Sequence, residues 1–367
     1  MGQPAADLII VGGGVAGLAA FAALAKGQRC LLLEREPMLA THASGKSAAI
    51  FRPLEADETT AALSARSRQG FAALMQDDPV RQSGLILASA DDVELHNWQL
   101  RGQRQGLEAQ LLAPAELRAL CPMVTTGEAL GGVLLPGGGV IDTHALMQAL
   151  AAAGRAAGGE IRTGQGVRSL WRQGARVCGV ELDDGTRLPA QQVVLAAGAW
   201  GRQLGESAGL GLPLAPARRH LVQLQLPASV ALSSAAPVLW RLDDELYLRP
   251  ESGGVLASPC DQQLFEPCDP PVDARALETL ADKLARTAPA LAAAQVRSRW
   301  ACLRTFAPDA ELVVGPDPRV TGLCWFAGLG GRGMAVSVGA AEVLAQRLAG
   351  SNSKLGAALD PARLALD

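Results

Sequence analysis

A strand, a glycine-rich turn, a helix and a second strand follow one another from Asp7 to Arg35, and this stretch constrains the possible folds more than any other. The apolar run Leu8–Val11 does not alternate with polar residues, which is typical of a parallel strand covered on both faces. We expect a helix over Val15–Lys26 with Gly27 as its C-terminal cap. Arg29–Leu33 predicts the returning strand. The pattern indicates an α/β fold with a doubly wound, Rossmann-type domain.

The turn inside this unit has the spacing G-x-G-x-x-G, formed by Gly12, Gly14 and Gly17. In dinucleotide-binding turns the first glycine allows the bend, the second lets the backbone approach a pyrophosphate, and the third lets helix and strand pack closely. The following helix directs its amides and its positive dipole end toward the phosphate. Glu34, at the end of the second strand, carries a carboxylate suited to ribose hydroxyls. The pattern therefore predicts a nucleotide site, without separating FAD from NAD, at Gly12, Gly14, Val15, Ala16, Gly17, Glu34 and Arg35.

Length and charge narrow the class of protein. A chain of 367 residues exceeds what one hydrophobic core usually supports, so two domains are expected. The formal net charge is -3 and the basic residues are dispersed, which argues against nucleic acid as a partner. There is also no run of about 20 apolar residues, so no transmembrane segment is expected.

The cysteines and histidines do not form a recognisable site. The 7 cysteines are odd in number and include no C-x-x-C pair, which argues against a disulfide framework and against a zinc site. The 4 histidines stand far apart and show no ligand spacing, so no metal is expected. Free cysteines fit a reducing compartment, and we expect the protein to be cytoplasmic.

Three further stretches are suited to contacting a ligand through small residues and free amides. The loop Thr41–Ala49 follows the second strand and carries Ser44 and Ser47, which are placed either to bind a second phosphate or to cap a helix in a surface loop. A buried strand at 193–196 leads into a turn of small residues that ends at Trp200. A last strand at 323–327 leads into a glycine-rich turn and a helix over 334–348.

The remaining pattern predicts mixed structure. Helices are expected over 59–75, 113–120, 143–157 and 273–287, and the helix at 143 has Asp142 or Thr143 as its cap. Short strands are expected between 161 and 188, around a hairpin at Asp183-Asp184-Gly185. The stretch 220–259 alternates like antiparallel sheet. Because nucleotide-type turns occur near both ends, we expect the two ends of the chain to build one domain.

Seven motifs give the chain a specific resemblance. They are Val11-Gly12-Gly13-Gly14-Val15-Ala16-Gly17, Leu33-Glu34-Arg35-Glu36, Ser44-Gly45-Lys46-Ser47-Ala48-Ala49, Ala196-Ala197-Gly198-Ala199-Trp200, Leu246-Tyr247-Leu248-Arg249-Pro250, Trp300-Ala301-Cys302-Leu303-Arg304 and Gly330-Gly331-Arg332-Gly333. Over nearly its whole length the chain resembles the D-amino acid oxidase (DAO) family of FAD-dependent oxidoreductases, and within it the bacterial D-amino acid dehydrogenases typified by D-arginine dehydrogenase. Lys46 stands where that family usually has arginine.

The resemblance implies bound FAD and a division into two domains. Residues 1–80, 140–212 and 306–367 would form a discontinuous FAD-binding domain, and 81–139 and 213–305 an interleaved antiparallel-sheet substrate domain. The adenosine would lie at the Gly12 turn and Glu34, with Val167 beside the adenine, and the isoalloxazine between the Ser47 loop and the Gly330 turn. The cofactor residues added by the resemblance are Ser44, Ser47, Ala48, Ala49, Val167, Ala197, Gly198, Trp200, Gly330, Gly331, Arg332, Gly333 and Met334.

The resemblance also implies a clamp for an amino acid. Holding the carboxylate so that Cα faces flavin N5 calls for a planar guanidinium and a phenol, and Arg304 and Tyr247 match these positions. Arg219 matches a further arginine near the pocket. The alternatives are a surface ion pair for Arg304, an ordinary sheet residue for Tyr247, and solvated charges for Arg219 and Arg332. The expected reaction is hydride transfer from Cα, giving an imino acid and then a 2-oxo acid and ammonia.

The expected substrate pocket departs from the D-arginine enzyme. Ile50, Glu55 and Gly84 stand where that enzyme has aromatic residues and a carboxylate for a cationic side chain, so D-arginine is disfavoured. We expect Glu55 either to meet an ammonium group or to be an exposed loop carboxylate. Val238 and Trp240 are expected in the pocket wall, which suits an apolar, small or cyclic substrate.

Three alternatives stay open at this point. Cys302 lies two residues before Arg304, where monomeric sarcosine oxidase attaches its flavin covalently, so the FAD is either non-covalent or linked through Cys302. The substrate is either an amino acid or a secondary amine of the glycine, sarcosine or imino acid type. The chain is either an enzyme by itself or a flavoprotein subunit of a hetero-oligomer. The electron acceptor would be O2, a quinone or another carrier.

Overall fold

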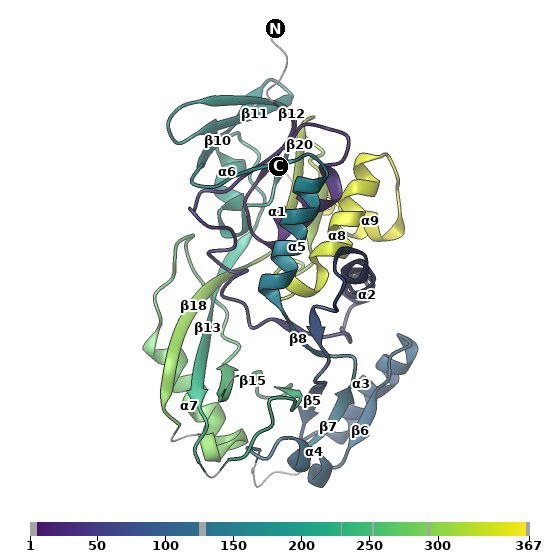
Figure 1. Cartoon of the computed structure of the whole chain (residues 1–367), viewed down its shortest axis with the longest axis vertical. Helices are drawn as coiled ribbons and strands as arrows, with labels where there is room; N and C mark the ends of the chain where they lie inside the picture. Colours follow the sequence, from purple (N-terminus) through teal and green to yellow (C-terminus); the bar gives the residue numbers. More distant parts are fainter. Residues whose placement is uncertain (1–5, 125–129, 229, 252, 292–293, 365–367) are drawn as a thin grey trace.

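The computed structural model describes residues 6–124, 130–228, 230–251, 253–291 and 294–364. The molecule is elongated, with one sheet in the upper half and a second sheet in the lower half of Figure 1. The long strands β13 (Ala215–Gln225) and β18 (Val296–Phe306) run side by side from the lower half toward the upper half. The expected α/β class with two unlike sheets is therefore confirmed.

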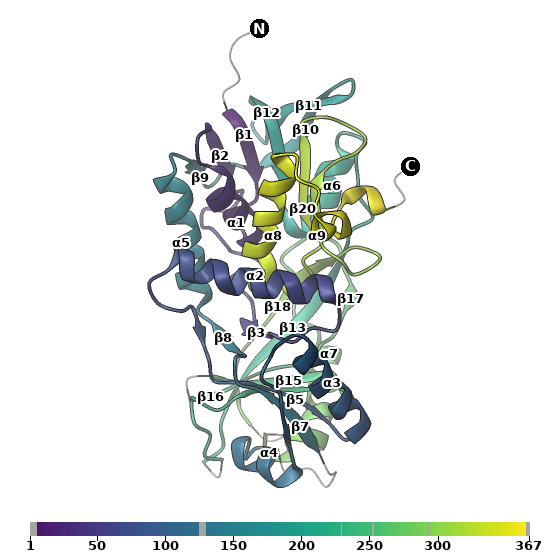
Figure 2. The same ribbon diagram turned by 90° about the vertical axis from the view of Figure 1, so that its right-hand side faces the viewer.

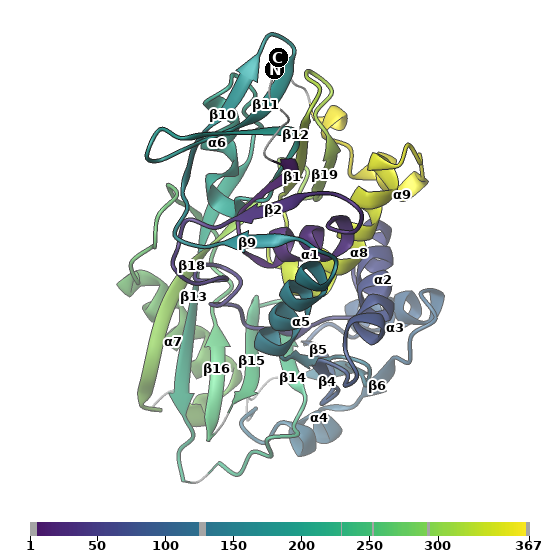
Figure 3. The ribbon, with the colours of Figure 1, turned by 45° about the horizontal axis from the view of Figure 1, so that its top comes forward.

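The first sheet has a parallel centre. Its strands pair in the order β9, β2, β1, β12 and β20, all parallel, and β19 adds antiparallel to β20. The strands β2, β9 and β1 are seen together in Figure 3. The bounds are β1 (Ala6–Val11), β2 (Cys30–Leu33), β9 (Glu160–Arg162), β12 (Arg187–Leu195), β19 (Val313–Pro316) and β20 (Leu323–Ala327).

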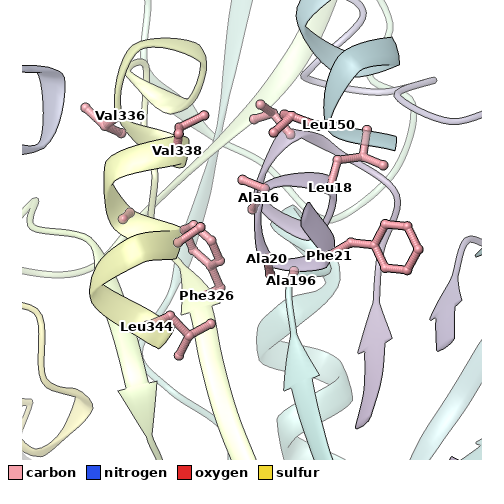
Figure 4. Packing of buried hydrophobic residues seen from close by; sticks show 14 of the residues in the cluster. Ala16, Leu18, Ala20, Phe21, Leu150, Ala196, Phe326, Val336, Val338 and Leu344 are labelled. Atoms are coloured by element: carbon pink, nitrogen blue, oxygen red, sulfur yellow. The ribbon is translucent and has the colours of Figure 1, made fainter. Parts of the chain in front are cut away.

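Helices cover one face of this sheet. The cluster formed there includes Phe21 of α1, Leu150 of α5 and Val336 of α8, all at most 1% exposed (Figure 4). A Cβ on Gly154 of α5 would lie 2.1 Å from the Phe21 ring, so the glycine is what allows α5 to pack so closely on α1. The helices of this half are α1 (Val15–Leu24), α2 (Glu58–Leu74), α5 (Thr143–Ala156), α6 (Gly201–Glu206), α8 (Gly333–Leu348) and α9 (Lys354–Ala358).

A β-ribbon covers the opposite face. β10 (Val167–Gln173) and β11 (Arg176–Leu182) pair antiparallel and continue into β12. Leu170 and Val180 of this ribbon belong to a buried cluster with the residues of β1 and β12 that point to this face. The expected hairpin is present, because β11 ends at Leu182 and β12 begins at Arg187. A doubly wound sheet usually has helices on both faces, and here the ribbon takes the place of one helical layer.

The second sheet is mixed. Its order is β17, β13, β16, β15, β14, β5, β7 and β6. β17 and β16 pair with different parts of β13, and β18 pairs along the length of β13. The pairs are antiparallel except β14 with β5, which is parallel. The further bounds are β5 (Leu85–Ser89), β6 (Gln110–Leu112), β7 (Gly131–Leu135), β14 (Val238–Arg241), β15 (Leu246–Glu251), β16 (Gly254–Ser258) and β17 (Gln263–Leu264).

Helices α4 (Pro114–Leu120) and α7 (Ala274–Thr287) lie against one face of this second sheet. Helix α3 (Asp92–Arg104) packs near β5 and β7 through Leu95. A small sheet of β3 (Ile50–Phe51), β8 (Gly139–Ile141) and β4 (Val80–Arg81) joins the two halves. Figure 2 shows α2 lying across the molecule between the halves. The short 3-10 helices are 198–200, 289–291 and 361–363.

The caps agree only in part with the sequence patterns. Asp142 caps α5 by accepting a hydrogen bond from the Ala145 amide, as one of the two expected candidates. The expected cap at Gly27 is wrong, because α1 ends earlier and its C-cap is Ala25. Gly27 lies in the turn beyond it, where its φ of 80° favours glycine. Within the described residues, no helix is both long and apolar enough to cross a membrane.

Candidate active site and cofactor pocket

A cavity of about 380 Å³ lies where the carboxyl ends of the parallel strands meet the second sheet. Such crevices are the usual ligand sites of open α/β sheets. Its walls come from the ends of β1, β2, β12 and β20, the loop 40–47, the loop 268–270 and β18. Sixteen predicted cofactor residues line it: Gly12, Gly14, Val15, Ala16, Glu34, Arg35, Ser44, Ser47, Val167, Ala197, Gly198, Trp200, Gly330, Gly331, Gly333 and Met334.

The first glycine turn leaves its backbone open to the cavity. Gly12 has a φ of 107°, and a Cβ on it would lie 2.5 Å from the Ala196 carbonyl oxygen. A Cβ on Gly14 would meet only the Ser44 hydroxyl oxygen, at 3.2 Å. The Ser44 hydroxyl accepts a hydrogen bond of 2.9 Å from the Val15 amide at the start of α1. Free amides, a hydroxyl and a helix N-terminus therefore converge where a phosphate would bind.

The far end of the cavity suits a ribose and a base. One oxygen of the Glu34 carboxylate accepts from the Gly13 amide at 2.6 Å, and the other accepts from the Glu36 amide at 2.8 Å. These bonds fix the carboxylate at the cavity wall. The Arg35 guanidinium lies 4.3 Å from the centroid of the Trp200 ring, and the His42 ring lies 4.7 Å from it. Together with Val167 they form a wall of flat and apolar groups.

The other end is formed by the Gly330 turn and β18. The Gly330 amide donates to the Thr305 carbonyl oxygen at 2.9 Å. The Arg304 Nη1 donates to the Gly331 carbonyl oxygen at 3.1 Å. Helix α8 begins at Gly333, so its N-terminal amides and positive dipole end face this part of the cavity.

Four predicted cofactor residues lie outside the cavity lining. Gly17 acts by packing, since a Cβ there would lie 1.8 Å from the Gly12 carbonyl oxygen. Ala48 accepts a hydrogen bond of 2.7 Å from Arg249 through its carbonyl oxygen, and Ala49 follows it into β3. The Arg332 guanidinium binds Asp57, Thr60 and the Ala310 carbonyl oxygen. It therefore does not line the cavity, and it is not the solvated charge of the alternative expectation.

Tyr247, Arg304 and Arg219 lie on one face of the second sheet, and of the three only Arg304 lines the cavity. Arg219 is directly opposite Cys302 in the β13–β18 pair, and Arg304 is opposite Ala217, so the two arginines are diagonal neighbours on one face. Tyr247 packs in a buried cluster with Leu221 and Cys302.

The Tyr247 hydroxyl is buried without a partner. The residue is 1% exposed, and its oxygen makes no hydrogen bond to the described residues. Burial raises the pKa of the phenol, and the positive charges of Arg304 and Arg219 oppose that rise. The nearby Ser258 hydroxyl also lowers the pKa, although the Tyr247 hydroxyl has no hydrogen-bond partner among the described residues. A buried polar atom in this condition costs free energy unless a ligand binds it.

Two of the four predicted pocket-wall residues, Trp240 and Ile50, pack in the cluster of Tyr247. The Trp240 ring lies 5.3 Å from the Tyr247 ring, as a cross-strand pair of β14 and β15. Val238 is buried in the neighbouring apolar cluster, and Ile50 packs against both clusters. Glu55 is 3% exposed and forms an ion pair with Arg52, so the expectation of a free carboxylate in an exposed loop is wrong.

Cys302 lines the cavity and is 2% exposed. Sequence reasoning missed the opposite wall, where Lys46 forms an ion pair with Asp269. Nothing in the sequence links Lys46 to a residue 223 positions away. Cys268 and Pro270 flank Asp269 and also line the cavity. Among the described residues, no group of three or more His, Cys, Asp or Glu side chains could hold a metal ion.

The arrangement fits FAD. The amides and hydroxyl at Gly14 and Ser44 suit a pyrophosphate, the fixed Glu34 carboxylate suits a ribose, and the Gly330 turn presents a helix N-terminus to a ring that becomes anionic on reduction. The orphaned hydroxyl of Tyr247 lies on the same sheet face as Arg304, which lines the cavity.

Comparisons with known proteins agree with this fit. The sequence model of the DAO family, described as FAD dependent oxidoreductase, matches residues 7–347. Human mitochondrial dimethylglycine dehydrogenase is 32% identical over 186 residues, which cover 50% of this chain and 21% of that protein. D-amino acid dehydrogenase of Paramagnetospirillum magneticum is 30% identical over 257 residues, covering 69% of this chain and 59% of that protein. The chain thus spans less than two thirds of these relatives.

Among solved structures, L-proline dehydrogenase of P. horikoshii superposes with a TM-score of 0.86 at 20% identity, covering 97% of both chains. At that identity the likeness establishes the fold alone, and it includes both sheets of the molecule.

Proposed function

The chain belongs to the DAO family of FAD-dependent oxidoreductases, and from this premise we propose that it oxidises the Cα–N bond of a small amino acid. The observation that carries the proposal is the Tyr247 hydroxyl, buried without a partner on the same sheet face as Arg304 and Arg219. A buried donor beside two guanidinium groups is suited to a carboxylate. When bound, FAD supplies the ring that accepts a hydride from Cα of the substrate.

Tyr247 and Arg304, the two side chains of the clamp, would contact the substrate carboxylate in different ways. Because burial raises the pKa of Tyr247, its hydroxyl is a neutral donor at physiological pH. Arg304 uses Nη1 on the Gly331 carbonyl oxygen, which fixes the guanidinium plane and leaves its other N–H groups for the carboxylate. Orienting the substrate in this way is the main contribution that the protein makes to such a step. The resulting imino acid reacts with water to give a 2-oxo acid and ammonia.

The pocket wall favours an uncharged side chain. Glu55 is committed to Arg52, and that arginine lies 4.9 Å from the centroid of the Trp240 ring. A cationic substrate such as D-arginine would find no free carboxylate at Glu55. We therefore propose a small, apolar or cyclic D-amino acid, and the likeness to the Paramagnetospirillum D-amino acid dehydrogenase supports this choice of stereochemistry.

The second candidate is oxidation of a secondary or tertiary amine that carries a carboxylate. The 32% identity with dimethylglycine dehydrogenase over half of the chain favours it. The clamp of Arg304 and Tyr247 would hold such a substrate equally well, because it recognises the carboxylate and not the nitrogen substituents.

A substrate panel separates these candidates. The purified chain, loaded with FAD, would be mixed anaerobically with a dye acceptor and with matched D-alanine, L-alanine, D-proline, L-proline, sarcosine and dimethylglycine. The first proposal expects the highest kcat/KM with a primary D-amino acid. Preference for the N-methyl compounds would favour the second candidate, and no turnover of any amine by the isolated chain would favour a subunit that needs a partner.

The same preparation tests two further points. Repeating the assay in air distinguishes O2 from a quinone or another carrier as acceptor. We propose non-covalent FAD, because Cys302 packs in an apolar cluster where a buried thiol is commonly structural. After acid precipitation the yellow colour should remain in solution, and colour in the pellet would instead indicate a link through Cys302.

A further inference from the structure

His220 forms a buried set of hydrogen bonds that the proposed chemistry does not use. It follows Arg219 on β13, and it is 1% exposed. Its backbone amide donates to the Asp261 Oδ1 at 2.9 Å, and its Nδ1 lies 2.7 Å from the Asp261 Oδ2. Its Nε2 accepts a hydrogen bond of 2.9 Å from the Asp273 amide. The imidazole thus joins the turn after β16 to the N-cap residue of α7.

These contacts determine the tautomer. A nitrogen that accepts from a backbone amide carries no proton, so the proton of the neutral ring lies on Nδ1 and is donated to Asp261. Asp261 therefore receives two hydrogen bonds from one residue. They lower the pKa of its carboxyl although burial alone would raise it. The carboxylate is consequently held at a fixed place beside β13.

Asp261, which His220 holds in place, contacts Arg219. The Asp261 carbonyl oxygen accepts a hydrogen bond of 2.6 Å from the Arg219 Nε. The preceding residue, Cys260, has a φ of 54°, which residues other than glycine rarely adopt. Such a turn persists only where its surroundings hold it, and His220 supplies two of the hydrogen bonds that do so.

Arg219 depends on this contact. Its bond to Asp261 is the one hydrogen bond of its guanidinium to the described residues, and it has no ion pair among them. It is 7% exposed, so bulk water does not fix its orientation either. A long side chain held at a single point is directed by that point.

We propose that His220 is a positioning residue, which acts through Asp261 to aim the Arg219 guanidinium at the substrate carboxylate. This inference rests on the proposed function, because it assumes that a carboxylate binds at Arg219. It gives His220 no contact with substrate or flavin.

Two variants separate positioning from simple packing. In His220→Asn the amide nitrogen takes the place of Nδ1 and can still donate to Asp261, but the side chain is too short to reach the Asp273 amide. In His220→Gln the amide oxygen takes the place of Nε2 and can accept from Asp273, but Asp261 loses its side-chain donor. His220→Asn therefore keeps the side-chain hydrogen bond to Asp261, which contacts Arg219. His220→Gln keeps only the hydrogen bond to the N-cap residue of α7.

The FAD-loaded variants would be assayed for KM, kcat and the Kd of acetate, a carboxylate without an oxidisable amine, from the change in flavin absorbance. We expect His220→Gln to raise KM and the acetate Kd about tenfold while kcat changes less than about threefold. His220→Asn should stay within about threefold of wild type in all three. Equal KM values in both variants, or a larger effect in His220→Asn, would overturn the inference.

A double-mutant cycle with Arg219→Met shows whether the effect passes through the arginine. In that background His220→Gln should cause no further rise in KM, because there is no guanidinium left to misplace. A further tenfold rise would overturn the inference. If His220→Gln does not bind FAD or does not fold, Asp261→Asn serves instead, and an unchanged KM in that variant would equally overturn it.

Different results would contradict the role of His220 and the proposed function. If Arg219→Met leaves KM unchanged while Tyr247→Phe raises it, the inference is wrong and the proposed function stands. If the wild-type holoenzyme neither binds acetate nor oxidises any compound of the substrate panel, the proposed function is wrong and the inference falls with it.

Discussion

The Arg304 Nη1 donates a hydrogen bond of 3.1 Å to the carbonyl oxygen of Gly331, which ties the edge strand β18 to the turn before α8. A Cβ on Gly331 would lie 2.5 Å from that nitrogen, so the contact depends on the glycine. This bond joins the proposed substrate clamp to the wall of the proposed flavin site, and substitutions at either place are expected to affect both.

Arg304→Lys keeps the positive charge but loses the planar fork of the guanidinium. We expect KM for the preferred substrate to rise at least about tenfold, because a hydrogen bond between charged groups contributes about 1.5–3 kcal/mol. Steady-state kinetics measure the change. Arg299→Gln is the matched control, since it removes a positive charge from an exposed position on the same strand. Similar KM values in the lysine variant and in the wild type would exclude Arg304 from carboxylate binding.

Tyr247→Phe removes one oxygen that has no partner within the described residues. We expect the acetate Kd to rise about tenfold, while the free energy of unfolding of the ligand-free protein stays within about 0.5 kcal/mol of wild type or rises. Flavin absorbance titration and chemical denaturation measure the two effects. Loss of stability without loss of affinity would mean that the hydroxyl serves the fold and not a ligand.

Gly14→Ala and Gly17→Ala separate the two tasks of the glycine turn. The added methyl at Gly14 meets only the Ser44 hydroxyl at 3.2 Å, so the protein should fold but bind FAD at least about tenfold more weakly. The methyl at Gly17 would lie 1.8 Å from a backbone oxygen, and we expect destabilisation above about 3 kcal/mol. Thermal unfolding and FAD titration test the pair. Full FAD affinity in Gly14→Ala would contradict a phosphate site there.

Asp317 gives the fold a pH-dependent contribution. Burial alone would raise the pKa of its carboxyl, but hydrogen bonds from Arg319 and Trp325 outweigh it and lower the pKa below its usual range. Because the folded pKa is the lower one, the stabilisation is present at neutral pH and is lost as the pH falls below about 4. Asp317→Asn should lower the free energy of unfolding at pH 7 by about 2 kcal/mol.

The pH profile provides the check. The difference between wild type and Asp317→Asn should shrink as denaturation is repeated from pH 6 to acid pH. Asp77→Asn, at an exposed position outside the helices and strands, should show little change at any pH. A difference that stays constant across the range would mean that the ionised carboxylate is not the stabilising form.

The parts of the fold that were predictable are those encoded locally. The glycine turn, the start of α1 at Val15 and the capping of α5 by Asp142, one of two expected candidates, depend on residues close in sequence, and they occur as expected. The pairing of Lys46 with Asp269 and of Arg332 with Asp57 joins distant segments and left no local pattern. The burial of Glu55 was not predictable for the same reason, because it depends on how the loop that carries Glu55 folds against α3 and β14. The domain boundaries and the roles of the site residues stay predictions.

The interleaving of the two halves has a consequence for biosynthesis. β1 pairs with β12, whose residues follow 184 positions later, and α1 packs against α8 near the far end of the described chain. The cofactor half therefore has no complete core until the ribosome has translated α8. Until then the nascent polypeptide exposes apolar surface of α1 and unpaired edges of β1, and this exposure makes it a natural client for chaperones.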